Sequence, residues 1–120
     1  MPAAVAVFLG GGLGAVCRFY LTRILANYQF PGGTMAANLL GCLLIGLLFN
    51  VSFRLVPTGP WKLFLATGFL GGLTTFSTFS LEFVQLIQAG KVQVAALYLA
   101  SNLIIGIALT YSFLNMGTSS

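Results

Sequence analysis

The chain has very little charge and almost no acidic side chains. Of its 120 residues, five are Lys or Arg, one is Asp or Glu, and none is His. Charged residues make up 5% of the chain, whereas a typical soluble domain carries about 25%. So few charges cannot cover a water-exposed surface, and 58% of the residues are hydrophobic. We therefore expect an integral membrane protein whose outer surface faces lipid.

The missing side chains also exclude several functions. With one acid and no His, the chain has no nucleophile–base pair, so we do not expect an enzyme. The five cations are scattered singly and form no basic face for nucleic acid. No Gly-rich loop precedes a Lys-Ser or Lys-Thr pair, so no ATP site is expected. Cys17 and Cys42 lie in apolar segments without CxxC spacing, and we expect them to be small apolar side chains rather than a disulfide or a metal pair.

Long apolar runs are what the sequence does contain. Four stretches are each long enough to span a bilayer, which takes about 20 residues. They are Ala3–Leu25, Thr34–Leu55, Trp61–Ile87 and Lys91–Met116. The connections between them are short, which predicts antiparallel neighbours. We therefore expect a single all-α domain over residues 1–120 with four transmembrane helices.

The third stretch departs from a regular helical pattern near its middle. Gly71-Gly72 is followed by Thr74-Thr75; adjacent glycines weaken a helix, and threonine hydroxyls can divert backbone hydrogen bonds. A break at that depth frees carbonyl oxygens, which is tolerated only where protein, water or an ion satisfies them. Broken membrane helices build ion sites near the midplane. The alternative is a kink that packs against a neighbouring helix through Gly68 and Gly72.

The cations do not fix one orientation in the membrane. Lys and Arg normally favour cytoplasmic loops. One side carries Arg54 and Lys62, and the other carries Arg23 and Lys91, with Arg18 added if its side chain extends toward the interface. The nearly equal number of cations on the two sides indicates either a weak orientation signal or insertion in both orientations with antiparallel pairing of two copies. In such a pair the two breaks would face each other, and their carbonyl oxygens could surround one Na⁺ ion.

Five hydroxyl side chains and two phenyl rings make up the run Thr74–Ser80, at the expected break. Phe76 and Phe79 share a helix face, with Ser77 and Thr78 between them. The edge of a phenyl ring is electropositive. Ring edges could therefore coordinate a small anion weakly enough to release it, as conduction requires. Taken alone, two phenylalanines at this spacing are more often packing residues.

Further polar side chains lie within the apolar stretches. The amide of Asn38 could donate hydrogen bonds to an anion, and Tyr98 and Asn102 share a helix face that could form a polar track. These side chains could equally join helices by hydrogen bonds. Arg18 lies well inside the first stretch and is a functional candidate by default. It could attract anions to an aqueous vestibule, extend to the interface, or pair with Glu82, the only acid.

In these motifs the chain resembles the CrcB/Fluc family of microbial fluoride channels, and the resemblance covers essentially its whole length. The matching pieces are Gly10–Ala15 with Arg18, Gly33–Thr34 with Asn38 and Gly41, and Gly71–Ser80 followed by Glu82. The resemblance implies an antiparallel, dual-topology homodimer in the inner (plasma) membrane, crossing it several times. It also implies two fluoride pores that lower fluoride toxicity by passive export, and a structural Na⁺ on the two-fold axis.

The resemblance also implies roles for individual residues. Backbone carbonyls of Gly71 and Thr74 from each subunit would hold the Na⁺, and Arg18 would attract anions. The pore residues would be Asn38, Phe76, Ser77, Thr78, Phe79, Tyr98 and Asn102. Family members usually place a serine about one turn after the tyrosine, where this chain reads Ser101-Asn102.

Two other functions fit part of the sequence. Proton-coupled exporters of the small multidrug-resistance type can also be four-helix antiparallel dimers, but they use a carboxylate that usually lies in the first helix. Here the first stretch has no acid, and Glu82 lies near the end of the third. A non-transporting assembly subunit would explain the fifteen glycines, but it leaves the hydroxyl-rich break without a purpose.

Overall fold

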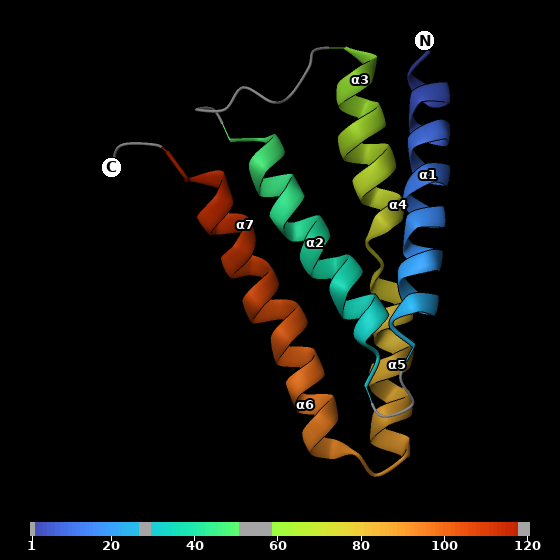
Figure 1. The fold of residues 1–120 in the computed structure, drawn as a ribbon, viewed down its shortest axis with the longest axis vertical. Coiled ribbons are helices and arrows are strands. Elements are labelled where there is room, and N and C mark those ends of the chain that lie inside the picture. Colours follow the sequence, from blue (N-terminus) through green and yellow to red (C-terminus); the bar gives the residue numbers. More distant parts are fainter. Residues whose placement is uncertain (1, 27–29, 51–58, 118–120) are drawn as a thin grey trace.

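The structure is a computed structural model that describes residues 2–26, 30–50 and 59–117, and every regular element within these ranges is helical (Figure 1). The elements are α1 (Ala3–Ile24), α2 (Gly32–Leu48), α3 (Pro60–Lys62), η1 (Leu63–Leu70), α4 (Gly71–Leu73), α5 (Phe76–Gln88), α6 (Val92–Ala100), η2 (Ser101–Ile105) and α7 (Gly106–Leu114). The two η segments are π-helical and have wider turns than an α-helix. They continue directly into their α-helical neighbours.

Among the described residues, three helical segments are long and apolar enough to cross a membrane. They are Ala3–Ile24, Pro60–Gln88 and Val92–Leu114. α2 is also apolar but has 17 residues, which corresponds to about 25 Å of helix against a hydrocarbon core of about 30 Å. Residues 51–55 of the second predicted stretch lie outside the described residues. The predicted all-helical membrane protein is confirmed, and the fourth spanning helix stays a prediction.

Stretches that follow one another in the sequence run in alternating directions, so that both described ends of the chain lie at the same end of the bundle (Figure 1). α1 packs along η1 and α4, and α2 packs along α7. α5 and α6 contact each other on the far side of the break in the third stretch. Consecutive stretches are therefore antiparallel, as the short connections predicted. The helices that pack along each other, α1 with η1 and α2 with α7, instead run parallel, because each pair joins stretches that are next but one in the sequence. The close contacts follow this order: Gly10 faces Phe64 and Gly14 faces Phe69, and Gly106 faces Cys42.

Glycines allow α1 and the third stretch to approach closely. A Cβ atom on Gly10 would overlap the carbonyl oxygen of Phe64, and one on Gly72 would overlap the carbonyl oxygen of Gly11. A Cβ atom on Gly68 would come within 3.0 Å of the Gly10 Cα. Small residues at a helix interface permit this kind of backbone contact in membranes. The packing through Gly68 and Gly72 that was one interpretation of the sequence is thus real.

The third stretch is nevertheless broken, and the break lies at the threonines rather than at the glycine pair. Thr74 (φ −93°, ψ 152°) and Thr75 (φ −150°, ψ 128°) are both extended, between the end of α4 and the start of α5. Gly71 and Gly72 are helical. Gly72 is held in the helix by its contact with α1, whereas β-branched threonines adopt extended backbone readily. The predicted break is confirmed, slightly farther along the chain than the glycines suggested.

Candidate functional site

The hydroxyl groups of the two threonines end one helix and begin the next. Thr74 Oγ1 donates to Leu70 O at 2.9 Å in the last turn before the break. Thr75 is the N-cap of α5, and its Oγ1 accepts a hydrogen bond from the Thr78 backbone N–H at 3.3 Å. The hydroxyls of Ser77 and Thr78 lie 3.3 and 3.4 Å from the same Oγ1 atom. Threonine is a favoured N-cap residue because its oxygen satisfies an otherwise unpaired N–H. The hydroxyl-rich run therefore has a local structural function at the break.

Asn38 of α2 pairs with the extended backbone of the break as a neighbouring strand would. Its Oδ1 accepts from the Thr75 N–H at 2.9 Å, and its Nδ2 donates to the Thr75 carbonyl oxygen at 3.3 Å. Nδ2 also donates to Asn102 Oδ1 at 3.0 Å. The two hydrogens of this amide thus have acceptors within the chain. An anion at Asn38 would have to replace one of these bonds.

The hydrogen bonds that the Thr75 and Thr78 N–H groups make leave two backbone carbonyls without their helical donors. In a continuous helix the Thr75 N–H would donate to Gly71 O, but here it donates to Asn38 Oδ1. The Thr78 N–H would donate to Thr74 O, but here it donates to Thr75 Oγ1. Backbone carbonyls are hard, neutral oxygen ligands that suit a monovalent cation better than a transition metal. The donor set at Gly71 and Thr74 therefore fits the Na⁺ ion that the family resemblance implies.

Arg18 of α1 reaches the break from the opposite side. Its Nε donates to the carbonyl oxygen of Gly72 at 3.1 Å, and the side chain is half-buried. The sequence left open whether Arg18 pairs with Glu82. In the structure Glu82 Oε1 instead accepts a hydrogen bond from the Tyr98 hydroxyl at 2.9 Å.

The two predicted pore phenylalanines lie side by side but in different surroundings. Their ring centroids are 5.8 Å apart, so the shared helix face is confirmed. Phe79 is 5% exposed and packs on Tyr98 at 5.2 Å between centroids. Phe76 is 76% exposed. Each chain therefore buries the Phe79 ring and leaves the Phe76 ring exposed at its surface.

Tyr98 and Asn102 join the break to α6 and η2. Tyr98 is fully buried, and its carbonyl oxygen accepts from Asn102 Nδ2 at 2.9 Å. Since Asn102 Oδ1 accepts from Asn38 and the Tyr98 hydroxyl donates to Glu82, polar groups follow one another from the break to α5. Tyr98 and Asn102 thus both make hydrogen bonds within the chain, Tyr98 through its backbone carbonyl and its hydroxyl, and their part in a polar track for an anion stays a prediction.

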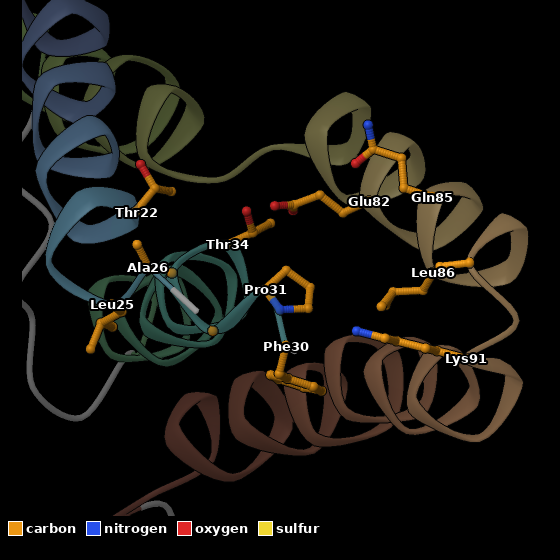
Figure 2. Close-up of a pocket in the computed structure, with 13 residues that line it drawn as sticks. Thr22, Leu25, Ala26, Phe30, Pro31, Thr34, Glu82, Gln85, Leu86 and Lys91 are labelled. Atoms are coloured by element: carbon orange, nitrogen blue, oxygen red, sulfur yellow. The ribbon is translucent and has the colours of Figure 1, made fainter. Parts of the chain in front are cut away.

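A cavity of about 480 Å³ lies at the Glu82 end of this series (Figure 2). The Glu82 carboxylate and the Thr34 hydroxyl point toward each other, and the Lys91 side chain extends toward Phe30 and Pro31 from the other side (Figure 2). Thr34 is 1% exposed, and its Oγ1 lies beside the Tyr98 hydroxyl without a hydrogen bond of good geometry. Thr34, which lines the cavity, thus has a buried hydroxyl that lacks a well-formed hydrogen bond among the described residues.

Sequence reasoning missed the contacts that three of these residues make. Thr34 lies one turn before Asn38, a spacing that places the two on one helix face, and this signal was available. The sequence pointed to Glu82 as a partner for Arg18, as the end of the family-like run and as a carboxylate placed wrongly for a proton-coupled exporter, but not as a contact of Tyr98. Thr75 belonged to the hydroxyl run, but its pairing with Asn38 joins residues far apart in the sequence and had no local signature.

A multi-pass helical protein with a broken helix and freed carbonyls has the features of membrane proteins that build ion sites at helix breaks. The chain belongs to the CrcB family. Residues 5–114 match the family model described as CrcB-like protein, Camphor Resistance (CrcB). The resemblance seen in the sequence is thereby confirmed.

Several relatives carry the name "Fluoride-specific ion channel FluC". The relative from Serratia proteamaculans (strain 568) is 49% identical over 94 residues, which cover 76% of this chain and 74% of that protein. The Flavobacterium psychrophilum relative is 41% identical over 110 residues, covering 88% and 89%. The Pyrococcus horikoshii relative is 39% identical over 107 residues, covering 88% and 87%. These relatives are named as ion channels, which confirms the prediction that the chain is not an enzyme.

Proposed function

We propose that the chain forms a fluoride-selective passive channel that lets F⁻ leave the cytoplasm across the inner membrane. The observation that carries the proposal is the series of polar groups Asn38–Asn102–Tyr98–Glu82, which starts at the helix break. It occurs in a chain whose relatives are named fluoride-specific ion channels. Amide, hydroxyl and ring-edge donors hold a small anion without the deep trap that a buried lysine would create.

Passive conduction is sufficient for detoxification. Fluoride enters cells as neutral HF from acidic surroundings, dissociates at cytoplasmic pH and is trapped as the anion. A negative membrane interior then drives the anion outward, so the channel needs no ATP and no coupled ion. The proton-coupled exporter that was the alternative receives no support from the family, and Glu82 lies in α5 rather than in the first helix.

The functional unit we propose is an antiparallel homodimer with two pores. Phe76 is 76% exposed on one chain, although its ring lies 5.8 Å from that of the buried Phe79. A second copy packed against the break would cover Phe76, so that each pore would use rings from both chains. Pairing about a two-fold axis is the commonest form of oligomer, and the near-even split of cations permits opposite insertion of the two copies.

The dimer would hold one Na⁺ through the carbonyl oxygens of Gly71 and Thr74 from each chain. Both carbonyls lack their helical donors because Thr75 and Thr78 donate elsewhere. The ion would compensate for these missing bonds and join the two breaks. Its contribution is structural, since fluoride would pass beside the aromatic rings rather than through the carbonyl site.

Efflux from liposomes tests the proposal. Purified protein is reconstituted into vesicles loaded with KF or KCl, valinomycin is added to release the electrical constraint, and the external anion is followed with an ion-selective electrode. Fluoride should leave far faster than chloride, and protein-free vesicles give the background. Equal rates for the two anions would remove the claim of selectivity.

A further inference from the structure

Arg18 contacts the backbone of the break. Its Nε donates to Gly72 O at 3.1 Å, across a residue separation of 54. The contact is possible because α1 and α4 lie backbone to backbone. Gly72 is so close to α1 that a Cβ atom on it would overlap the carbonyl oxygen of Gly11. Gly11 and Arg18 are two helical turns apart on the same face of α1. The close packing at Gly11 and Gly72 thus places the Arg18 guanidinium at the end of α4.

The carbonyl that Arg18 contacts is one that the break has deprived of its usual partner. In a continuous helix Gly72 O would accept from the Phe76 N–H, but Phe76 begins α5 beyond two extended residues. A carbonyl without a partner is costly in hydrocarbon, and a cationic donor makes a stronger hydrogen bond than a neutral one. The end of a helix also carries partial negative charge, which a cation stabilises.

We propose that Arg18 is a positioning residue that fixes Gly72 O and thereby orients the neighbouring carbonyls of Gly71 and Thr74 toward the shared cation. This inference rests on the Na⁺ site of the proposed function. Of the freed carbonyls, Gly72 O is satisfied within the chain by Arg18, and Gly71 O and Thr74 O remain for the ion. Arg18 then acts through backbone geometry, and its charge does not serve to collect fluoride.

Two readouts separate positioning from anion attraction. The first is the NaCl concentration that gives half-maximal thermal stability of the detergent-solubilised dimer, with N-methylglucamine chloride keeping the ionic strength constant. The second is the fluoride concentration that gives half-maximal flux in liposomes. A positioning residue changes the first, whereas a residue that collects anions changes the second.

Arg18→Met should raise the half-maximal NaCl concentration about tenfold, the loss expected for one hydrogen bond from a charged donor. The half-maximal fluoride concentration should stay unchanged. Arg18→Lys should restore most of the sodium response, because an ammonium group can also donate to Gly72 O. Arg23→Met is the matched control. Arg23 lies over the Phe19 ring in the last turn of α1, so its removal should change neither readout.

The outcomes are distinguishable. If Arg18→Met behaves like Arg23→Met, or raises only the half-maximal fluoride concentration, the positioning role is wrong while the proposed channel stands. If the wild-type dimer does not respond to NaCl, the sodium site fails and the inference fails with it. If the wild-type protein passes no fluoride, the proposed function itself is wrong.

A measurement on the wild-type protein covers the case in which Arg18→Met does not fold. The chain has three arginines, Arg18, Arg23 and Arg54. With ¹⁵N-labelled arginine, the Nε–H of Arg18 should exchange with solvent more slowly than that of the exposed Arg23, and its signal should be absent from the Arg18→Lys protein. Equal exchange at Arg18 and Arg23 would contradict the hydrogen bond to Gly72.

Discussion

Asn38 is the side chain on which the geometry of the break most depends. One amide makes two hydrogen bonds to the extended residue Thr75 and a third to Asn102. No other described side chain joins α2, the break and η2 in this way. A residue that looked like an anion ligand in the sequence therefore also holds the backbone that an anion would pass.

Removing the Asn38 amide should destabilise the protein and stop conduction. In Asn38→Leu the N–H and carbonyl of Thr75 lose their partners, and an unsatisfied buried polar group costs about 1–3 kcal/mol. We expect the thermal midpoint to fall and fluoride flux to be lost. Asn115→Leu is the control, because Asn115 is exposed near the end of the chain. Equal effects of the two substitutions would contradict this role for Asn38.

Phe79 offers a second test at the scale of one residue. Phe79→Ile keeps an apolar side chain of moderate size but removes the ring edge, so most fluoride flux should be lost while the dimer still assembles. Phe83→Ile is made on the same helix, at a ring that is only partly buried against the Phe79 cluster. It should retain most of the flux. Normal flux in the Phe79 variant would show that this ring only packs.

At the scale of elements, the contact between α1 and α4 is what supports the break. Gly72→Ala would place a methyl group against Gly11 O, which forces the two helices apart. We expect a loss of stability of about 1–3 kcal/mol, as for other overpacked sites, and a weaker response to Na⁺. Gly12→Ala serves as the control, because a Cβ atom there meets nothing within 4 Å. Dimer thermal midpoints measured with and without NaCl check both variants.

The helices themselves could be predicted from the sequence, and the polar contacts between them could not. Long apolar runs and short connections were enough to place the helical segments and their antiparallel order. The glycine pair pointed to the right region for the break, but the packing of Gly72 on α1 keeps this segment helical, and the break lies at Thr74 and Thr75. That packing depends on a residue pair 61 positions apart in sequence, Gly11 and Gly72, so no local pattern reports it.

The site shows the same division between local and long-range information. The shared face of Phe76 and Phe79 follows from helical spacing, and the rings do lie together. The partners of the charged residues do not follow from spacing. Arg18 bonds to Gly72 O and Glu82 accepts from Tyr98, contacts that are decided by which helices pack together.

At the scale of the whole molecule, the proposed sodium ion makes assembly depend on the surrounding salt. Replacing NaCl by N-methylglucamine chloride at equal ionic strength should lower the thermal midpoint of the dimer and reduce fluoride flux, because the carbonyls of Gly71 and Thr74 would then lack a partner. A ligand that binds only the native state stabilises it in proportion to the logarithm of its concentration. The midpoint should therefore rise steadily with added NaCl. An unchanged midpoint across the series would contradict the sodium site.

The pairing of Asn38 with Thr75 also bears on how the protein is made. Without the Asn38 amide beside it, the Thr75 N–H has only Gly71 O within easy reach, and a continuous helix satisfies the backbone best. The extended residues become favourable only when α2 brings the Asn38 amide alongside. The broken form of the third stretch therefore depends on its packing against α2, and the break can form only after these two helices have come together.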